Sequence, residues 1–469
     1  MTQLIQPRVL KGFRDYPPEL MIPRERLLET ARRVYRSYGY APIDTPALEF
    51  TEVLLGKGGA ETDRQLFRFK HHDDDVALRF DLTVPFARFS ATHVPKLGTP
   101  FKRYHMGPVW RGERPQKGRY REFWQCDFDT IGTTSNAADI ETALVIHDLM
   151  VGLGLEQFTH AEKAANRLKR FEIRINNRLV LNGLLEVMGA AEKSAPVLRT
   201  LDKLPKIGAE KVAVEMQAEA GVSADQARRI IALAGLTGGN DEILDQVERD
   251  FGGNAKVAEG VARLRELLAV SARAGVAPGR IVIDLSICRG LDYYTGMIYE
   301  SFLVGSYADD ESGEVKQLES FGSVCSGGRY DNLASLYTKQ VLPGVGASLG
   351  LDRLLAAMEE LGMLPKVATP APVFVVQFEA SRLGDYQRVA RLLRSAGIGA
   401  EVYPDAKKIG QQLSYAVKRG FRIALVPTPD EFAKGLWNIK DLTTPKDADD
   451  KKEFVPEVDL VEIVRSRLG

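Results

Sequence analysis

The chain has 469 residues, of which 44% are hydrophobic, and its 63 basic residues balance its 63 acidic ones. This length and composition predict two or three domains with sizeable cores, and zero net charge excludes nucleic-acid binding through a global positive field. The sequence has no long apolar run, no signal-peptide layout and no metal-binding cysteine or histidine spacing, which indicates a soluble, cytoplasmic protein without a metal site or membrane contact.

The first predicted element is a helix over residues 23–38, where apolar side chains recur at helical spacing, Pro23 suits the first turn and Gly39 can end the helix. Residues 43–46 follow as a short extended segment that ends in a proline, which belongs at an edge or a break. Most amphipathic helices pack on their own core, so these elements alone indicate no function.

Two strands are predicted at residues 66–69 and 76–80, joined by the polar turn HHDDD. Asp81 and Thr83 come next and share one face if the chain stays extended. A carboxylate and a hydroxyl on one face suit a substrate ammonium group. The competing interpretation is an ordinary cap of the helix that follows Pro85, and the residues alone favour this cap.

The most informative stretch is residues 101–132. Its two ends alternate aromatic or β-branched residues with polar ones, which predicts two antiparallel strands, and glycines and a proline interrupt the pattern between them. Residues 102–121 carry seven basic side chains against one acidic one, Glu113. Arginine guanidinium groups suit phosphate groups. Composition alone does not distinguish an anion-binding site from a charged hairpin exposed to solvent.

The middle of the chain changes from mixed to helical patterns. The elements expected there are a helix over 136–150, strands over 171–175 and 178–181, and helices throughout 184–274. Ser223 and Asn254 are suitable helix caps. A helical block between strand segments indicates an insertion in an α/β core.

Strand character returns at residues 280–285, and Arg289 follows in the glycine-containing sequence CRGLDYYTG. Alone, Arg289 could be a surface residue or a fixed cation at a reaction centre. After the acidic loop 308–316, two adjacent glycines in 322–333 allow a close backbone approach. In 342–355 the glycines miss the GxGxxG spacing and no GK[ST] follows, which excludes Rossmann and P-loop sites.

A proline-containing polar segment at 366–372 indicates a linker. The βαβαβ pattern over 373–426, followed by a strand at 436–442 and a helix at 460–467, predicts a small α/β domain with a parallel or mixed sheet. From Pro370 on, 16 basic residues stand against 14 acidic ones, so charge alone does not indicate RNA binding.

The segment Arg111-Gly-Glu-Arg, a short loop and Arg119-Tyr-Arg-Glu-Phe123 resemble the second motif of class II aminoacyl-tRNA synthetases. The continuation Gln125-Cys-Asp-Phe-Asp129 is similar to the histidyl-tRNA synthetase family in particular. RGLDYY and GSVCSGGRYDNL resemble that family's two histidine-specific motifs, and LPGVGASLGLDRLL resembles the third class II motif. The resemblance extends along nearly the whole chain.

This resemblance implies an α/β (α+β) fold with an antiparallel class II sheet flanked by helices, a helical insertion, and a small C-terminal α/β anticodon-binding domain. The implied boundaries are a catalytic core in two parts, 1–165 and 276–365, a mostly helical insertion at 166–275, and the anticodon-binding domain at 372–469. The resemblance also implies a homodimer, with the first class II motif at the dimer interface, and an insertion that helps to clasp the tRNA acceptor arm.

The implied activity is that of a histidine–tRNA ligase, which activates L-histidine with ATP and transfers it to the 3′-terminal ribose of tRNA(His). Arg289 and Arg111 match the catalytic positions. The histidine-binding positions are Asp81, Thr83, Gln125, Asp129, Tyr293, Tyr294 and Tyr330. The ATP-binding positions are Arg111, Glu113, Arg119, Phe123 and Arg353. Mg²⁺ is expected as an ion of the ATP substrate, with loose demands on protein carboxylates.

Asp129 and Tyr294 could together pair with both nitrogens of a neutral imidazole, which is the basis of a strong preference for histidine. Two alternatives share the fold: a regulatory subunit of ATP phosphoribosyltransferase and a catalytically inactive tRNA sensor. The former typically lacks RGLDYY and the C-terminal domain, and the latter usually loses the motif arginines. The RGLDYY motif, the C-terminal domain and the motif arginines are all present in this sequence. The prediction is therefore an active ligase.

Overall fold

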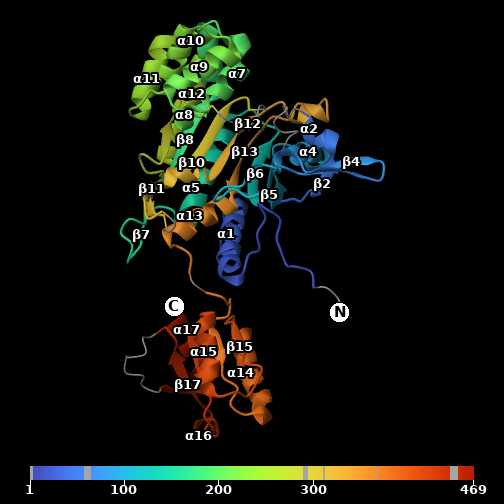
Figure 1. The fold of residues 1–469 in the computed structure, drawn as a ribbon, viewed down its shortest axis with the longest axis vertical. Coiled ribbons are helices and arrows are strands. Elements are labelled where there is room, and N and C mark those ends of the chain that lie inside the picture. The colour runs from blue at the N-terminus through green and yellow to red at the C-terminus, as the bar shows by residue number, and fades with distance from the viewer. Residues whose placement is uncertain (1–3, 57–64, 289–293, 310–311, 366, 444–452) are drawn as a thin grey trace. The chain divides into compact units, whose positions relative to one another are not determined.

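Figure 1 shows the fold in a computed structural model, which describes the chain except for residues 1–3, 57–64, 289–293, 310–311, 366 and 444–452. The described residues form two compact units. One consists of Met1–Arg14 with Leu27–Met363, and the other of Asp15–Arg26 with Leu364–Gly469. None of the helices in these ranges is both long enough and apolar enough to cross a membrane.

The larger unit is built on a ten-stranded sheet with the order β1-β5-β6-β13-β12-β10-β8-β7. Its strands are β1 Ala41–Pro42, β5 Phe101–Trp110, β6 Glu122–Ile131, β7 Phe158–Thr159, β8 Arg167–Asn177, β9 Ile281–Ile283, β10 Met297–Ala308, β11 Val315–Gln317, β12 Cys325–Tyr330 and β13 Gly344–Gly350. All neighbouring pairs from β5 to β7 are antiparallel. The predicted antiparallel class II sheet is therefore confirmed.

The predicted hairpin is formed by β5 and β6. Phe101 lies opposite Ile131 at one end, and Trp110 lies opposite Glu122 at the other, beside the loop. The Trp110 indole donates a hydrogen bond to the Glu122 carboxylate at 2.7 Å. The hairpin lies inside the sheet, because β6 also pairs with β13.

Helices α5 Asn136–Gly152 and α13 Leu351–Leu361 accompany this sheet, together with the part of α1 Pro18–Ser37 that belongs to the larger unit, from Leu27 on. The prediction for the start of α1 is wrong, because the amides of Leu20 and Met21 donate to the Pro17 carbonyl and close an earlier first turn. Pro23 consequently lies inside the helix. Helix α5 begins as predicted, capped by the Ser135 hydroxyl, which accepts from the Ala137 amide.

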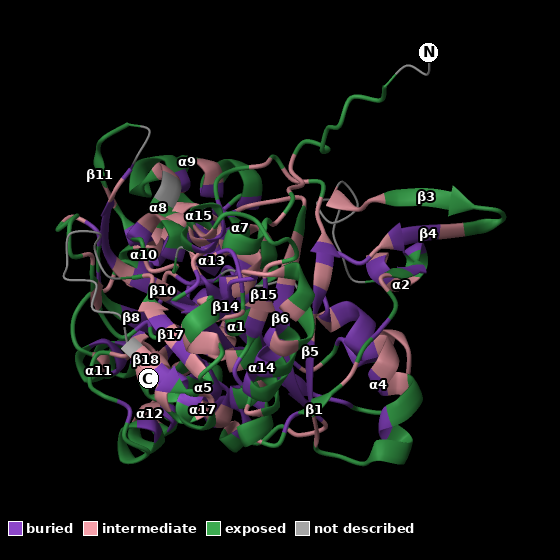
Figure 2. Ribbon diagram, turned by 90° about the horizontal axis from the view of Figure 1, so that it is seen from below, coloured by how far each residue is buried: buried purple, intermediate pink, exposed green. Residues whose placement is uncertain are grey.

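A separate three-stranded sheet has the order β2-β4-β3. Its elements and neighbours are β2 Leu48–Phe50, α2 Thr51–Leu55, β3 Arg68–His71, β4 Asp74–Leu78 and α4 Thr83–Leu97. The two strands predicted before Asp81 are confirmed, with bounds shifted by up to two residues. Figure 2 shows β3 exposed along its whole length.

The helical segment of the larger unit consists of α6 Arg178–Val187, α7 Ser194–Leu201, α8 Leu204–Ile207, α9 Ala209–Ala220, α10 Ala224–Ala234, α11 Asn240–Phe251 and α12 Ala255–Arg273. The predicted caps Ser223 and Asn254 are confirmed. The strand predicted at 178–181 is wrong: the Asn177 side chain accepts from the Leu179 amide and starts α6 instead. Strand β8, which opens the expected mostly helical insertion over 166–275, pairs with β10 in the main sheet.

The helical segment holds the chain that leads to Arg289. The Asn240 amide at the start of α11 donates to the Ile281 carbonyl at 2.9 Å and accepts from the Ile283 amide at 2.8 Å. The Cys288 thiol donates to the Leu198 carbonyl of α7 at 3.3 Å. These contacts fix both ends of the segment from β9 to Cys288 against helices.

The smaller unit contains a five-stranded sheet with the order β15-β14-β16-β17-β18. Its elements are β14 Val373–Val375, α14 Leu383–Ser395, β15 Ala400–Val402, α15 Ile409–Arg419, β16 Ile423–Val426, α16 Pro429–Phe432, β17 Leu436–Asp441, β18 Glu453–Pro456 and α17 Leu460–Leu468. Strand β14 is parallel to β15 and β16, while β17 is antiparallel to its neighbours. The predicted small α/β fold with a mixed sheet is confirmed.

Candidate active site

One face of the large sheet carries polar side chains from adjacent strands. Gln125, Asp127 and Asp129 alternate along β6 and therefore share a face. Across the β5–β6 pairing, Arg103 lies opposite Asp129 and His105 lies opposite Asp127. All five residues are buried, so this polar face forms an interior wall.

Small residues on β12 and β13 leave room for the side chains of this wall. Gly346 lies opposite Asp129 in the β6–β13 pairing, and a Cβ atom there would overlap the Asp129 carboxylate. A Cβ atom on Gly328 would lie 3.1 Å from the Tyr294 ring, and one on Gly327 would overlap the backbone of β13. The close approach predicted for the adjacent glycines is therefore confirmed.

Asp129 has two partners from distant parts of the chain. The Arg103 Nη2 atom lies 2.6 Å from Asp129 Oδ2, and the Tyr330 hydroxyl donates to Asp129 Oδ1 at 2.5 Å. Burial raises the pKa of both Asp127 and Asp129, and the positive charge of Arg103 acts in the opposite direction. Tyr294 lies near these carboxylates. Burial raises the pKa of Tyr294, and the negative charges of Asp129, Asp127 and Asp81 raise it further.

Asp81 and Thr83 do not share an extended chain as predicted, because α4 already begins at Thr83. Asp81 is buried, and its Oδ1 atom accepts from the Val84 amide at 3.1 Å. The competing interpretation, in which Asp81 caps the helix, therefore agrees with this hydrogen bond. Its negative charge also contributes to the raised pKa of Asp127, which places Asp81 beside the wall formed by β6.

Arg111, Arg119 and Arg353 lie close to one another and form a cationic group. The pKa of Arg353 falls to about 10, first through burial and then through the positive charges of Arg119 and Arg111. The Arg111 Nε atom donates to the Phe80 carbonyl at 2.9 Å, and its guanidinium lies 5.1 Å from the centre of the Phe123 ring. Clustered cations are stabilised by an anion, so the group suits phosphate oxygens.

The packing of the β5–β6 loop on α13 brings these arginines together. Gly118 adopts a φ of 72° in that loop, and a Cβ atom there would lie 3.8 Å from the Arg353 Cα atom. The Asp352 carboxylate accepts from the Trp124 amide at 2.7 Å. The loop and the first turn of α13 therefore form one surface.

Comparison with known proteins identifies the family of this chain. The family model described as histidyl-tRNA synthetase matches residues 12–354. The chain belongs to the histidyl-tRNA synthetase family. The family model of an anticodon-binding domain matches residues 373–467 of this synthetase, which corresponds to the smaller sheet and its helices.

Relatives of this synthetase cover nearly its whole length. The histidine–tRNA ligase of Rhodopirellula baltica is 54% identical over 95% of this chain and 96% of the relative. That of Wolinella succinogenes is 43% identical over 94% of each chain. The crystal structure of the histidyl-tRNA synthetase from Nostoc sp. PCC 7120 superposes with a TM-score of 0.83 and 31% identity, covering 99% of this chain and 100% of that one.

The predicted site residues of this synthetase fall into three sets. The structure brings Gln125, Asp129, Tyr294 and Tyr330 to the carboxylate wall, it places Asp81 and Thr83 at the start of α4, and it brings Arg111, Arg119, Phe123 and Arg353 close to one another. Glu113 lies 3.8 Å from Arg119. Arg289 and Tyr293 lie outside the described residues. Sequence reasoning missed Arg103 and Asp127, although their alternation with Asp129 in the predicted hairpin could have placed them on its face.

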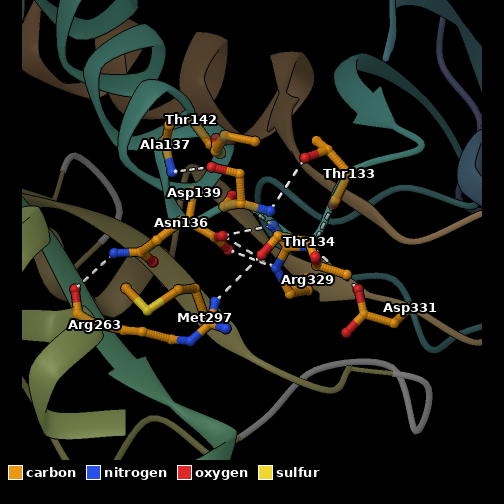
Figure 3. A network of polar contacts seen from close by, with 12 residues as sticks. Thr133, Thr134, Asn136, Ala137, Asp139, Thr142, Arg263, Met297, Arg329 and Asp331 are labelled. Carbon is orange, nitrogen blue, oxygen red and sulfur yellow. Dashed lines mark hydrogen bonds and ion pairs between the residues drawn. The ribbon is translucent and has the colours of Figure 1, made fainter. Parts of the chain in front are cut away.

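A second buried ion pair joins β12 to α5 (Figure 3). The Arg329 guanidinium on β12 donates to both oxygens of Asp139 on α5, and also to the carbonyls of Thr133 and Ser135. Asp331 accepts from the Thr295 hydroxyl at 2.8 Å. Because these bonds flank Tyr330 and Tyr294 in the chain, they hold the two phenol-bearing segments side by side.

Proposed function

We propose that this chain is a histidine–tRNA ligase that forms histidyl-adenylate from L-histidine and ATP and then esterifies the terminal ribose of tRNA(His). The observation that carries the proposal is the cluster of Arg111, Arg119 and Arg353 at the end of β6 that carries Phe123, on a strand whose same face also carries the buried Asp129. The first reaction requires cations that bind the triphosphate of ATP and a carboxylate that binds the imidazole of histidine.

On the nucleotide side, Arg111 binds the α-phosphate and Arg353 the γ-phosphate, while Arg119 adds positive charge between them. The Phe123 ring stacks on adenine and Glu113 accepts from its amino group. ATP enters with Mg²⁺ bridging its phosphate oxygens as part of the substrate. The partly buried, mutually repelling guanidinium groups favour this polyanion over water.

On the histidine side, Asp129 accepts the imidazole N–H and Tyr294 donates to the other ring nitrogen. Asp81 and Thr83 bind the α-ammonium group at the start of α4. Gln125 is held by the Ser348 hydroxyl at 2.8 Å and lines the pocket with Tyr293 and Tyr330. The spacing of the two ends of this pocket then selects an amino acid of histidine length.

In the first step a histidine carboxylate oxygen attacks the α-phosphorus of ATP, and the bond to the leaving pyrophosphate breaks. Arg111 and Arg289 stabilise the charge that builds on the phosphoryl oxygens. In the second step the tRNA ribose hydroxyl attacks the acyl carbon and AMP leaves. The AMP phosphate accepts the ribose proton, so the protein needs no general base of its own.

The whole assembly follows the family pattern: a cytoplasmic homodimer whose residues 372–469 read the anticodon of tRNA(His). The core parts 1–165 and 276–365 carry the chemistry, and the helical segment clasps the acceptor arm. Sedimentation of the full-length protein would test the dimer, with a monomer as the contradicting outcome.

ATP–pyrophosphate exchange measured with each of the twenty amino acids tests the activity. Exchange with histidine alone is expected, and Asp129→Ala should abolish it while leaving the circular dichroism spectrum unchanged. Exchange with none of them would favour the catalytically inactive regulatory or tRNA-sensing alternative. Unchanged exchange in Asp129→Ala would remove this carboxylate from the site.

A further inference from the structure

Arg103 lies between the two regions that the proposed function assigns to opposite ends of histidine. Its Nη2 atom is 2.6 Å from Asp129 Oδ2 and donates to the Leu82 carbonyl at 3.3 Å. Leu82 stands between Asp81 and Thr83, the residues assigned to the ammonium group. A single guanidinium therefore joins the imidazole end of the pocket to its ammonium end.

The surroundings of Arg103 differ from those of a purely structural ion pair. The side chain is completely buried, and its guanidinium lies 4.3 Å from the centre of the Phe86 ring in α4. A second carboxylate, that of Asp127, lies 3.9 Å away. Within the described part of the chain, Arg103 Nε and Nη1 have no hydrogen-bond partner. A structural pair normally satisfies such buried donors, because leaving them unpaired is costly.

The charge of Arg103 also opposes the effect of burial on the pKa of Asp129. Burial alone favours a neutral carboxylic acid, and Arg103 is the main opposing influence, followed by the Tyr330 hydrogen bond. A carboxylic acid that keeps its proton accepts the imidazole N–H less well than a carboxylate does. The titratable groups that face Asp129 are Arg103 on β5, Asp127 on β6, Tyr330 on β12, Tyr294 before β10 and Asp81 before α4.

We propose that Arg103 is the positioning residue of the histidine pocket: it pairs with the Asp129 carboxylate and holds it at a fixed distance from the segment that binds the amino group. The inference rests on the proposed function and adds a residue that does not touch the substrate itself. Arg103 acts through Asp129 and the Leu82 backbone, so its loss affects histidine recognition more than ATP binding.

The test compares the full-length wild type with Arg103→Met, Arg103→Lys and the control Lys102→Met in ATP–pyrophosphate exchange. Histidine and ATP are each varied with the other saturating, between pH 6 and 9. Lys102 is the matched control because it is the neighbouring cation on β5 but pairs with Glu141 at 2.6 Å. The protonation of free histidine affects all variants equally. It therefore cancels when the kinetic constant of a variant is divided by that of the wild type at the same pH.

Arg103→Met is expected to raise the KM for histidine about 30-fold, equivalent to about 2 kcal/mol, and to change the KM for ATP less than about 3-fold. When kcat/KM for histidine is plotted against pH, the acid limb of Arg103→Met should lie at higher pH than that of the wild type. Arg103→Lys should restore the acid limb but keep a raised histidine KM, because an ammonium group lacks the planar fork. Lys102→Met should match the wild type.

Equal losses for ATP and histidine, or an unmoved acid limb in Arg103→Met, would overturn the inference. If Arg103→Met does not fold, the histidine KM of Arg103→Lys decides: a raised value supports the inference and a wild-type value overturns it. A wild type without histidine-dependent exchange would contradict the proposed function instead.

Discussion

Arg329 and Asp139 are 190 positions apart in the chain, yet the Arg329 Nη2 and Asp139 Oδ2 atoms lie 2.6 Å apart in the interior of the larger unit. Both residues are almost completely buried, at 4% and 0% exposure. The pair joins α5 to β12 and so fixes the strand that carries Tyr330.

Asp139→Ala should destabilise the protein by about 3–5 kcal/mol, because it leaves the Arg329 guanidinium buried without its carboxylate. Urea unfolding of the full-length protein measures the change. The double variant Asp139→Leu with Arg329→Met should recover part of the loss. A loss below about 1 kcal/mol in Asp139→Ala would contradict the structural role of the pair.

Arg353→Ala should lower the rate of ATP–pyrophosphate exchange about 10²–10³-fold, since it removes one preorganised cation from the nucleotide site. Initial rates at saturating histidine provide the measurement. Arg170→Ala is the control, because Arg170 is half-exposed on β8 and pairs with Glu172 at 2.6 Å. Equal rates for Arg353→Ala and the control would place the triphosphate elsewhere.

Gly346→Ala should weaken histidine binding and destabilise the fold by about 1–3 kcal/mol, because the added methyl group overlaps both Asp129 Oδ1 and the Phe128 carbonyl. The KM for histidine and the thermal midpoint report the two effects. Gly350→Ala on the same strand is the control, since its nearest neighbour would be 3.6 Å away. Similar behaviour of the two variants would show that the Asp129 side chain moves aside easily.

His105 should make the protein less stable in acid. Burial, with the charges of Arg103 and Arg79, lowers the pKa of His105 from 6.5 to about 3. Between these values the unfolded chain binds a proton that the folded chain excludes, so stability falls as the pH falls. From pH 7 to 5 this loss amounts to about 2 kcal/mol.

The variant His105→Gln has no imidazole to protonate, so its stability should fall less than that of the wild type between pH 7 and 5. Urea unfolding at the two pH values gives the difference. The raised pKa values of Asp127 and Asp129 change stability in the opposite direction, but both proteins share them. Equal pH dependence in the two proteins would mean that His105 is protonated in the fold.

Local pattern was sufficient to predict the elements that carry most of the site. The alternation in 101–132 predicted the β5–β6 hairpin, and the pattern at 136–150 predicted helix α5, whereas 342–355 was identified only by its resemblance to the third class II motif. Period-two alternation also implies which residues share a face. Arg111 and Arg353 were assigned to the nucleotide site by their resemblance to known motifs. No spacing rule alone would have predicted that these two residues lie close together.

The wrong predictions share a physical cause, which is that caps and distant partners override local patterns. Asn177 caps a helix where the apolar run at 178–181 predicted a strand, and helix α4 starts two residues after Asp81 where an extended chain was expected. The role of Arg103 depends on Asp129 and Leu82, and only the folded sheet brings these residues together.

The hydrogen bonds of Asn240 and Cys288 have a mechanical consequence for the ligase. Any rotation of the helical segment must either break these bonds or carry the chain up to Cys288 along with it. As long as these bonds persist, the helical segment and the chain from the end of β9 to Cys288 move together.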